Sequence, residues 1–143
     1  MEAKFVKLRE NAHIPTQGSN KAACFDLYAC EGAYICPGQT KLIPTGLAIQ
    51  PPEGFCAKIY ARSGIAAKRG LRPANCVGVC DEDYTGEYMV ALHNDSNEMQ
   101  TISDGERIAQ LAFEKYYAVE FIEVESLQET ERGSGGFGST GTN

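Results

Sequence analysis

Short runs of β-forming residues recur along the middle of this chain, and proline or glycine separates each run from the next. Three such runs cover residues 41–43, 47–49 and 55–60. Strands of this length and spacing are typical of β-sandwiches and β-barrels. No long segment has the 3.6-residue period of an amphipathic helix, and no segment repeats another. The sequence therefore predicts an all-β domain.

One segment breaks this pattern and predicts a single short helix. Ser63 is a suitable N-cap, the alanines that follow favour a helical turn, and Gly70 can end it. Free N–H groups at the start of such a helix, beside the guanidinium of Arg62, would attract an anion. Arg-Ser-Gly triplets also occur in ordinary turns, so this segment alone leaves both interpretations open.

Residues 77–92 concentrate acidic side chains between two strand-like runs. Asp81, Glu82 and Asp83 follow the first run, and a Thr-Gly turn leads into the second, which predicts a β-hairpin. If side chains alternate through the carboxylates, Asp81 and Asp83 share one face and Glu82 lies on the other. A solvated hairpin tip and an acidic pocket are both compatible with this pattern.

Three further features carry polar groups of interest. Alternation over residues 22–29 places Asp26 on the polar face of a strand, where we expect it to be exposed. Gln110 lies among apolar residues of a later strand and would need a hydrogen-bond partner if buried. Residues 132–141 are too rich in glycine to fold alone, yet their arginine, phenylalanine and hydroxyls could close over a phosphate.

Composition and charge narrow the class of protein. A length of 143 residues with 43% hydrophobic and 22% charged residues is typical of one globular domain. The formal charge of −6 argues against nucleic-acid and membrane partners, which need clustered Lys and Arg. An anionic substrate would therefore need a local basic cluster or a cation.

Targeting and metal signals are also lacking in the sequence. The N-terminus has no apolar signal core and no run reaches the length of a membrane span, so we expect a cytoplasmic protein. In such a protein the 6 cysteines are expected to be reduced thiols. No C-x-x-C pair supports a zinc site.

Five of the segments described above occur in the order of the five motifs of the trimeric deoxyuridine triphosphatase (dUTPase) family, which the chain resembles over almost its whole length. In order, they cover residues 22–29, 61–66, 75–86, 105–111 and 132–141. Two positions depart from the family pattern: Ala61 replaces a usual proline, and Cys80 replaces a usual isoleucine. Neither change removes a functional group.

The resemblance implies a jelly-roll-like β-barrel subunit over residues 1–131 and a flexible C-terminal lid over residues 132–143. It implies a homotrimer in which each active site draws motifs from all three chains. The implied reaction is Mg²⁺-dependent hydrolysis of dUTP to dUMP and pyrophosphate, which keeps uracil out of DNA and supplies dUMP for thymidylate synthesis.

The resemblance also implies roles for individual residues. Asp81 is expected to orient or deprotonate the water that attacks the α-phosphorus. Asp26 is expected to reach Mg²⁺ only through water, because the ion would be held mainly by the substrate phosphates. The residues expected around the nucleoside are Asn75, Val79, Cys80, Tyr84, Met89 and Phe137. The residues expected around the phosphates are Arg62, Ser63, Gly64, Gln110, Arg132, Ser139 and Thr140.

Two alternatives follow from the same comparison. The related dCTP deaminases share the fold but use a glutamate at the position that corresponds to Ala91 here, which argues against deamination. A β-trimer with an added regulatory protein-binding role also fits the sequence. Asp81 and the lid pattern argue against a protein that only binds, because binding alone would need neither.

Overall fold

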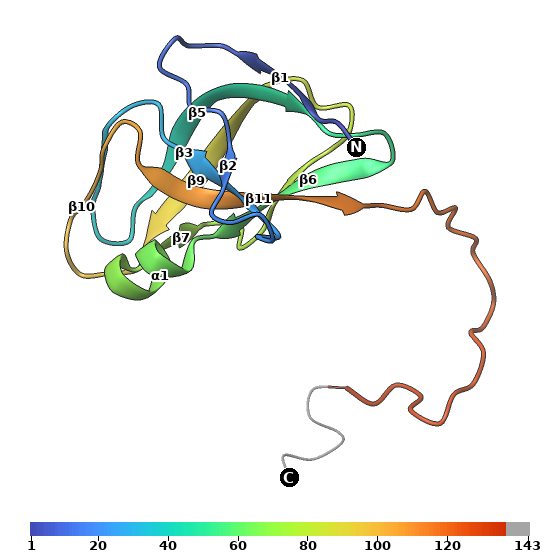
Figure 1. The fold of residues 1–143 in the computed structure, drawn as a ribbon. Coiled ribbons are helices and arrows are strands. Elements are labelled where there is room, and N and C mark those ends of the chain that lie inside the picture. Colours follow the sequence, from blue (N-terminus) through green and yellow to red (C-terminus); the bar gives the residue numbers. More distant parts are fainter. Residues whose placement is uncertain (137–143) are drawn as a thin grey trace.

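The computed structural model describes residues 1–136, which form eleven strands and one short helix (Figure 1). In chain order the elements are β1 (Lys4–Lys7), β2 (Thr16–Gln17), β3 (Phe25–Tyr28), β4 (Ala33–Ile35), β5 (Thr40–Gln50), β6 (Phe55–Ala61), α1 (Ser63–Arg69), β7 (Leu71–Pro73), β8 (Gly78–Cys80), β9 (Glu87–Asn94), β10 (Gln100–Ile102) and β11 (Arg107–Lys115). None of the described helices has both the length and the apolar character needed to span a bilayer.

The strands form two main antiparallel sheets and a small third one. One sheet has the order β1-β5-β9-β7, the second has the order β2-β3-β11-β6-β8, and β10 pairs with β4. Neighbours in the sheets are often distant in sequence, as expected for a jelly-roll-like arrangement. The structure confirms the predicted all-β fold with one short helix.

Inward-facing side chains of both main sheets fill the core. In β9 alternate residues are buried, so Tyr88, Val90 and Leu92 face inward while Met89 is exposed. This period of two is the pattern of a strand with one face on the core. The other fully buried large apolar residues are Leu27, Ile35, Ile43, Leu47, Leu71, Ile102, Ile108 and Leu111.

The two short runs predicted at residues 41–43 and 47–49 form one continuous strand, β5. Its pairing with β9 shifts register between Pro44 and Ala48, which marks a β-bulge. Gly46 adopts a φ of 70° there, and a Cβ at this position would lie 2.8 Å from the Cβ of Ala12. Proline and glycine therefore bend this strand and do not end it.

The helix α1 forms where the sequence predicts it but begins differently. Arg62, in an extended conformation, is the N-cap residue, and its side chain makes no capping hydrogen bond. Ser63 is already the first helical residue, so the predicted Ser63 cap is wrong. Gly70 ends the helix in the left-handed conformation with φ 64°, as predicted.

The predicted hairpin over residues 77–92 is wrong, although both of its strands exist. β8 pairs with β6, whereas β9 pairs with β5 and β7 in the other sheet. Residues 81–86 therefore cross from one sheet to the other. Local alternation identifies a strand but cannot identify its partner, and both edges of β9 are already occupied.

The chain leaves the β-sheet body after β11 (Figure 1). Residues 116–136 contain no strand or helix, and nearly all of them are exposed. The boundary proposed at residue 131 between the barrel and the lid remains a prediction.

Candidate active site

A cavity of about 440 Å³ opens where β8 and β9 separate into different sheets. Five of the residues predicted from the sequence line it, namely Val79, Cys80, Asp81, Tyr84 and Met89. The fold thus brings the expected base and most of the expected nucleoside contacts together at one cavity. We call this cavity the β8–β9 pocket.

Three residues that sequence reasoning missed also line the β8–β9 pocket: Leu42, Glu87 and Tyr88. Leu42 comes from β5, which is far away in sequence, so no local pattern could have placed it here. Tyr88 could have been noticed, because alternation along β9 turns it inward when Met89 faces out.

The turn that carries Asp81 is shaped by Tyr84. The backbone N–H of Tyr84 donates to the Asp81 carbonyl at 3.2 Å, and its hydroxyl donates to the Glu87 carbonyl at 3.0 Å. The tyrosine lies against Gly86, where a Cβ would come within 2.5 Å of the hydroxyl oxygen. Gly86 therefore provides the space that seats Tyr84 at the β8–β9 pocket.

Glu82 does not follow the predicted alternation, because β8 ends at Cys80 and a turn follows. Its Oε2 accepts hydrogen bonds from the Tyr116 hydroxyl at 2.7 Å and from the Gly54 N–H at 2.8 Å. Both hydrogen bonds lower the pKa of Glu82, and the bond from Tyr116 has the larger effect. Asp81 and Asp83 are both exposed.

Tyr88 and Cys80 lie together at the inner side of the pocket. Tyr88 is fully buried, and its hydroxyl has no hydrogen-bond partner of standard geometry within the described residues. Burial, together with the adjacent Cys80 thiol, raises the pKa of Tyr88 well above its usual value. Burial also raises the pKa of the Cys80 thiol, which favours its neutral form. All six cysteines are free.

Two of the predicted phosphate-binding residues, Arg62 and Gln110, lie next to a buried carboxylate, that of Asp26. Asp26 is only 5% exposed, so the expectation of a solvated side chain is wrong. Its Oδ1 accepts from Arg62 Nε at 2.9 Å, and its Oδ2 accepts from Arg107 Nη1 at 3.2 Å. A buried carboxylate needs such partners. Gln110 pairs with Asp26 in the β11–β3 register.

Arg107 was not among the residues predicted for the site. It stands at the start of β11, and only the pairing of β11 with β3 brings it to Asp26. The Arg62 side chain lies near the first turn of α1, with its Nη1 atom 4.0 Å from the position that a Cβ on Gly64 would take. Ser63 and Gly64 are exposed beside it. This group forms a second cluster, with two guanidiniums for one carboxylate.

The two clusters lie apart in one chain. Cys80, directly before Asp81, pairs with Ala57 of β6. Arg62 follows Ala57 by five residues, just beyond the far end of the same strand. At the rise of an extended strand, this separation is about 17 Å. The expected base and the expected phosphate turn therefore do not meet at one point of a single subunit.

The remaining predicted residues lie outside both clusters or beyond the described part. Asn75 is exposed in the turn before β8, with its Nδ2 3.4 Å from the position of a Cβ on Gly78. The Arg132 Nε donates to the Gly135 carbonyl at 2.9 Å. Phe137, Ser139 and Thr140 lie outside the described residues.

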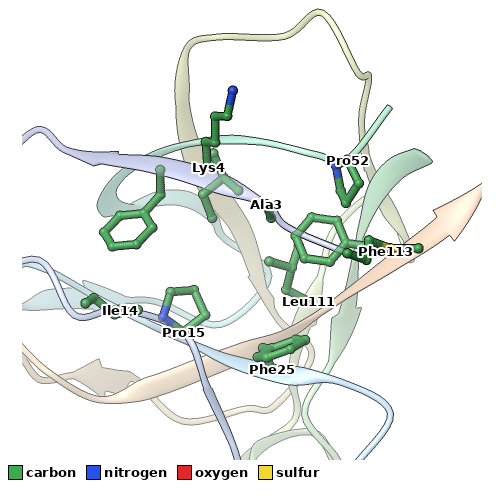
Figure 2. Close-up of a pocket in the computed structure, with 11 residues that line it drawn as sticks. Ala3, Lys4, Ile14, Pro15, Phe25, Pro52, Leu111 and Phe113 are labelled. Carbon is green, nitrogen blue, oxygen red and sulfur yellow. The ribbon is translucent and has the colours of Figure 1, made fainter. Parts of the chain in front are cut away.

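A second cavity, of about 400 Å³, has an almost wholly apolar lining (Figure 2). Phe25 and Phe113 border it with ring centroids 6.4 Å apart, and Phe5 of β1 also lines it. None of the predicted site residues lines this cavity. We therefore assign the chemistry to the β8–β9 pocket.

The described residues contain no cluster of three or more His, Cys, Asp or Glu side chains that could cage a metal ion. Asp26, the carboxylate nearest the phosphate turn, has both oxygens engaged by arginines. The described residues therefore offer no ready-made cage, and an ion such as Mg²⁺ would need other ligands, such as substrate phosphates and water.

Together, these features define a class of small all-β proteins that carry an acidic cleft between two sheets and a separate arginine-led turn. Comparison with known proteins identifies the family within this class. The dUTPase family model matches residues 10–141. The chain belongs to the dUTPase family.

Relatives and solved structures agree with this assignment. The deoxyuridine 5'-triphosphate nucleotidohydrolase of Nautilia profundicola is 48% identical, with 99% of each chain covered. The Finegoldia magna protein of the same name is 42% identical, again over 99% of each. A structure of the Staphylococcus bacteriophage 80alpha dUTPase G164S mutant with dUpNHpp has a TM-score of 0.92 and 25% identity, covering 99% of each chain.

Proposed function

We propose that this protein hydrolyses dUTP to dUMP and pyrophosphate, with the deoxyuridine bound in the β8–β9 pocket. The observation that carries the proposal is the convergence of five predicted residues on this cavity: Val79, Cys80, Asp81, Tyr84 and Met89. The activity named for the relatives supports the same reaction.

Base selection follows from the position of β8. This strand lies at the edge of its sheet, so backbone groups on its free side are not engaged by a neighbouring strand. Val79 and Cys80 use these groups to pair with the uracil edge, together with the Asn75 amide. Cytosine would leave them unpaired, and unpaired polar groups discriminate strongly between substrates. Tyr84 stacks under the deoxyribose and leaves no room for a 2′-hydroxyl.

Asp81 acts as the general base. Its exposed carboxylate at the pocket accepts a proton from a water molecule, whose oxygen forms a bond to the α-phosphorus. The bond between the α-phosphorus and the oxygen bridging to the β-phosphorus breaks, and pyrophosphate leaves. Phe137 covers the uracil during this step.

The phosphates bind to Arg62, Ser63, Gly64 and Gln110, and Asp26 holds the Arg62 guanidinium in place. The lid residues Arg132, Ser139 and Thr140 contact the outer phosphates. The separation of about 17 Å between the base and the phosphate turn along β6 supports a site shared between chains, as in the homotrimer that the family resemblance implies.

Mg²⁺ is the proposed cofactor, held by the substrate phosphates and water, with Asp26 within reach only through water. When bound, the ion offsets phosphate charge and withdraws electrons from the reacting phosphorus. We place the protein in the cytoplasm, with dUTP and its own copies as partners and without nucleic-acid or membrane binding. The net charge of −6 supports the absence of nucleic-acid and membrane binding.

The test is pyrophosphate release by the purified protein from dUTP, UTP, dCTP and dTTP, with and without Mg²⁺. We expect release from dUTP alone, and only with the ion. Equal rates on UTP would remove the role of Tyr84, and no release from dUTP would refute the assignment. Asp81→Asn should still bind dUpNHpp but lose most turnover, whereas Glu53→Gln, an exposed carboxylate outside the pocket, should match the wild type.

A further inference from the structure

Glu82 differs from the two carboxylates beside it. Asp81 and Asp83 are exposed, and neither side chain makes a hydrogen bond within the described residues. Glu82 is half-buried and accepts two hydrogen bonds at one oxygen, from the Tyr116 hydroxyl at 2.7 Å and the Gly54 N–H at 2.8 Å. Both donors lie on other parts of the body, so Glu82 ties its turn to them.

Three segments meet at this carboxylate. Gly54 belongs to the loop between β5 and β6, and Tyr116 directly follows β11. The Tyr116 N–H also donates to the Gly54 carbonyl at 3.2 Å, so these two partners are joined to each other. After β11, which ends one residue before Tyr116, the chain leaves the sheet body (Figure 1).

The turn has few other restraints. Between the end of β8 and the start of β9, its backbone makes one hydrogen bond among the residues that the structure describes, from the Tyr84 N–H to the Asp81 carbonyl at 3.2 Å. The Tyr84 hydroxyl adds one bond, to the Glu87 carbonyl. Neither bond links the turn to the β5–β6 loop or to the end of β11. That link is made by Glu82.

We propose that Glu82 is a positioning residue that holds the turn carrying Asp81 in its productive place, an inference that rests on the proposed function. Asp81 must lie within hydrogen-bond reach of the attacking water, and a displacement of 1 Å costs on the order of 100-fold in rate. Because its partner Tyr116 directly follows β11, Glu82 also links the catalytic turn to the place where the chain leaves the sheet body.

The electrostatics agree with this geometry. The Tyr116 hydroxyl and the Gly54 N–H lower the pKa of Glu82, so its carboxylate is charged throughout the neutral range. A charged acceptor strengthens both hydrogen bonds. The same contact with Glu82 raises the pKa of Tyr116, which keeps that hydroxyl protonated as a donor.

The experiment compares Glu82→Ala, Glu82→Gln and Tyr116→Phe in the full chain, by steady-state dUTP hydrolysis and by the Kd for dUpNHpp. We expect Glu82→Ala to lower kcat by about 10- to 100-fold with the Kd within about twofold. Glu82→Gln should recover most of kcat, because its amide oxygen accepts from the same two donors. Tyr116→Phe removes one of the two donors, so its kcat should lie between those of Glu82→Ala and Glu82→Gln. Glu53→Ala, an exposed carboxylate next to Gly54, is the matched control and should match the wild type.

Several outcomes would overturn the inference. These are wild-type kcat in Glu82→Ala, a Glu82→Gln variant as slow as the alanine variant, or equal losses in kcat and in dUpNHpp affinity. If Glu82→Ala does not fold, the decision passes to Tyr116→Phe, where wild-type kcat refutes the proposal and reduced kcat with unchanged Kd supports it. No dUTP hydrolysis by the wild type would refute the proposed function and this inference with it, whereas failure in the variants alone refutes only the inference.

Discussion

The replacement Asp26→Asn tests the buried cluster on the phosphate side. In the wild type the Asp26 side chain is 6% exposed and bonds to Arg62 at 2.9 Å and Arg107 at 3.2 Å. Asparagine has nearly the same volume but no charge. Its amide offers one acceptor oxygen, and its NH₂ group faces a guanidinium that needs an acceptor. The change therefore leaves two arginines without their counter-ion.

The size of the effect follows from how buried each partner is. Breaking a fully buried ion pair costs about 3–5 kcal/mol, because the remaining charge stays out of water. Here the Arg62 and Arg107 side chains are 26% and 49% exposed, so water can hydrate them after the change. We therefore expect a loss of about 2 kcal/mol in the free energy of unfolding, below the fully buried range. For a chain of this size, that corresponds to a Tm lower by about 4–8 °C.

The assay is thermal unfolding followed by circular dichroism at one fixed protomer concentration, because association adds to the apparent stability. Glu31→Gln is the matched control, because it also changes a carboxylate to an amide, in the exposed 2.8 Å pair between Arg9 and Glu31. We expect no resolved change in its Tm. The KM for dUTP should rise in Asp26→Asn alone. Equal shifts in the two variants, or a wild-type Tm in Asp26→Asn, would refute the reasoning.

Three further results are expected. Tyr88→Phe should raise the free energy of unfolding by about 1 kcal/mol in urea titrations, because it removes a buried hydroxyl without a standard partner; a loss would mean that the Cys80 contact is a stabilising hydrogen bond. Truncation before Arg132 should leave the Tm unchanged and lower turnover, since the last strand ends well before it; unfolding of the truncated chain would make the tail structural. The folded-state pKa of Glu82 lies below its ordinary 4.5, so the stability that its charge contributes is present above pH 4.5 and is lost as the pH falls through the folded value. The Tm of Glu82→Gln should therefore decline less on acidification than the Tm of the wild type. Identical declines in the two proteins would contradict this.

Local sequence patterns predicted much of the fold. Runs of β-forming residues gave strands close to their true positions, and Gly70 marked the end of the helix because few other residues adopt a left-handed φ. The cavity residues Val79, Cys80, Asp81, Tyr84 and Met89 were also predicted, but from family resemblance and not from local physics. Local patterns also gave two wrong predictions, the hairpin over residues 77–92 and the Ser63 cap.

The sequence by itself determined which segments become strands, where the single helix ends, and which family the motifs resemble, because these depend on neighbouring residues and their order. The tertiary structure alone decided that β8 and β9 join different sheets, that Asp26 is buried between Arg62 and Arg107, and that Glu82 reaches Tyr116. Each of these depends on strands paired across long sequence separations, and alternation along one strand carries no information about its partner. Register, and with it the burial of charge, is therefore set only when the sheets assemble.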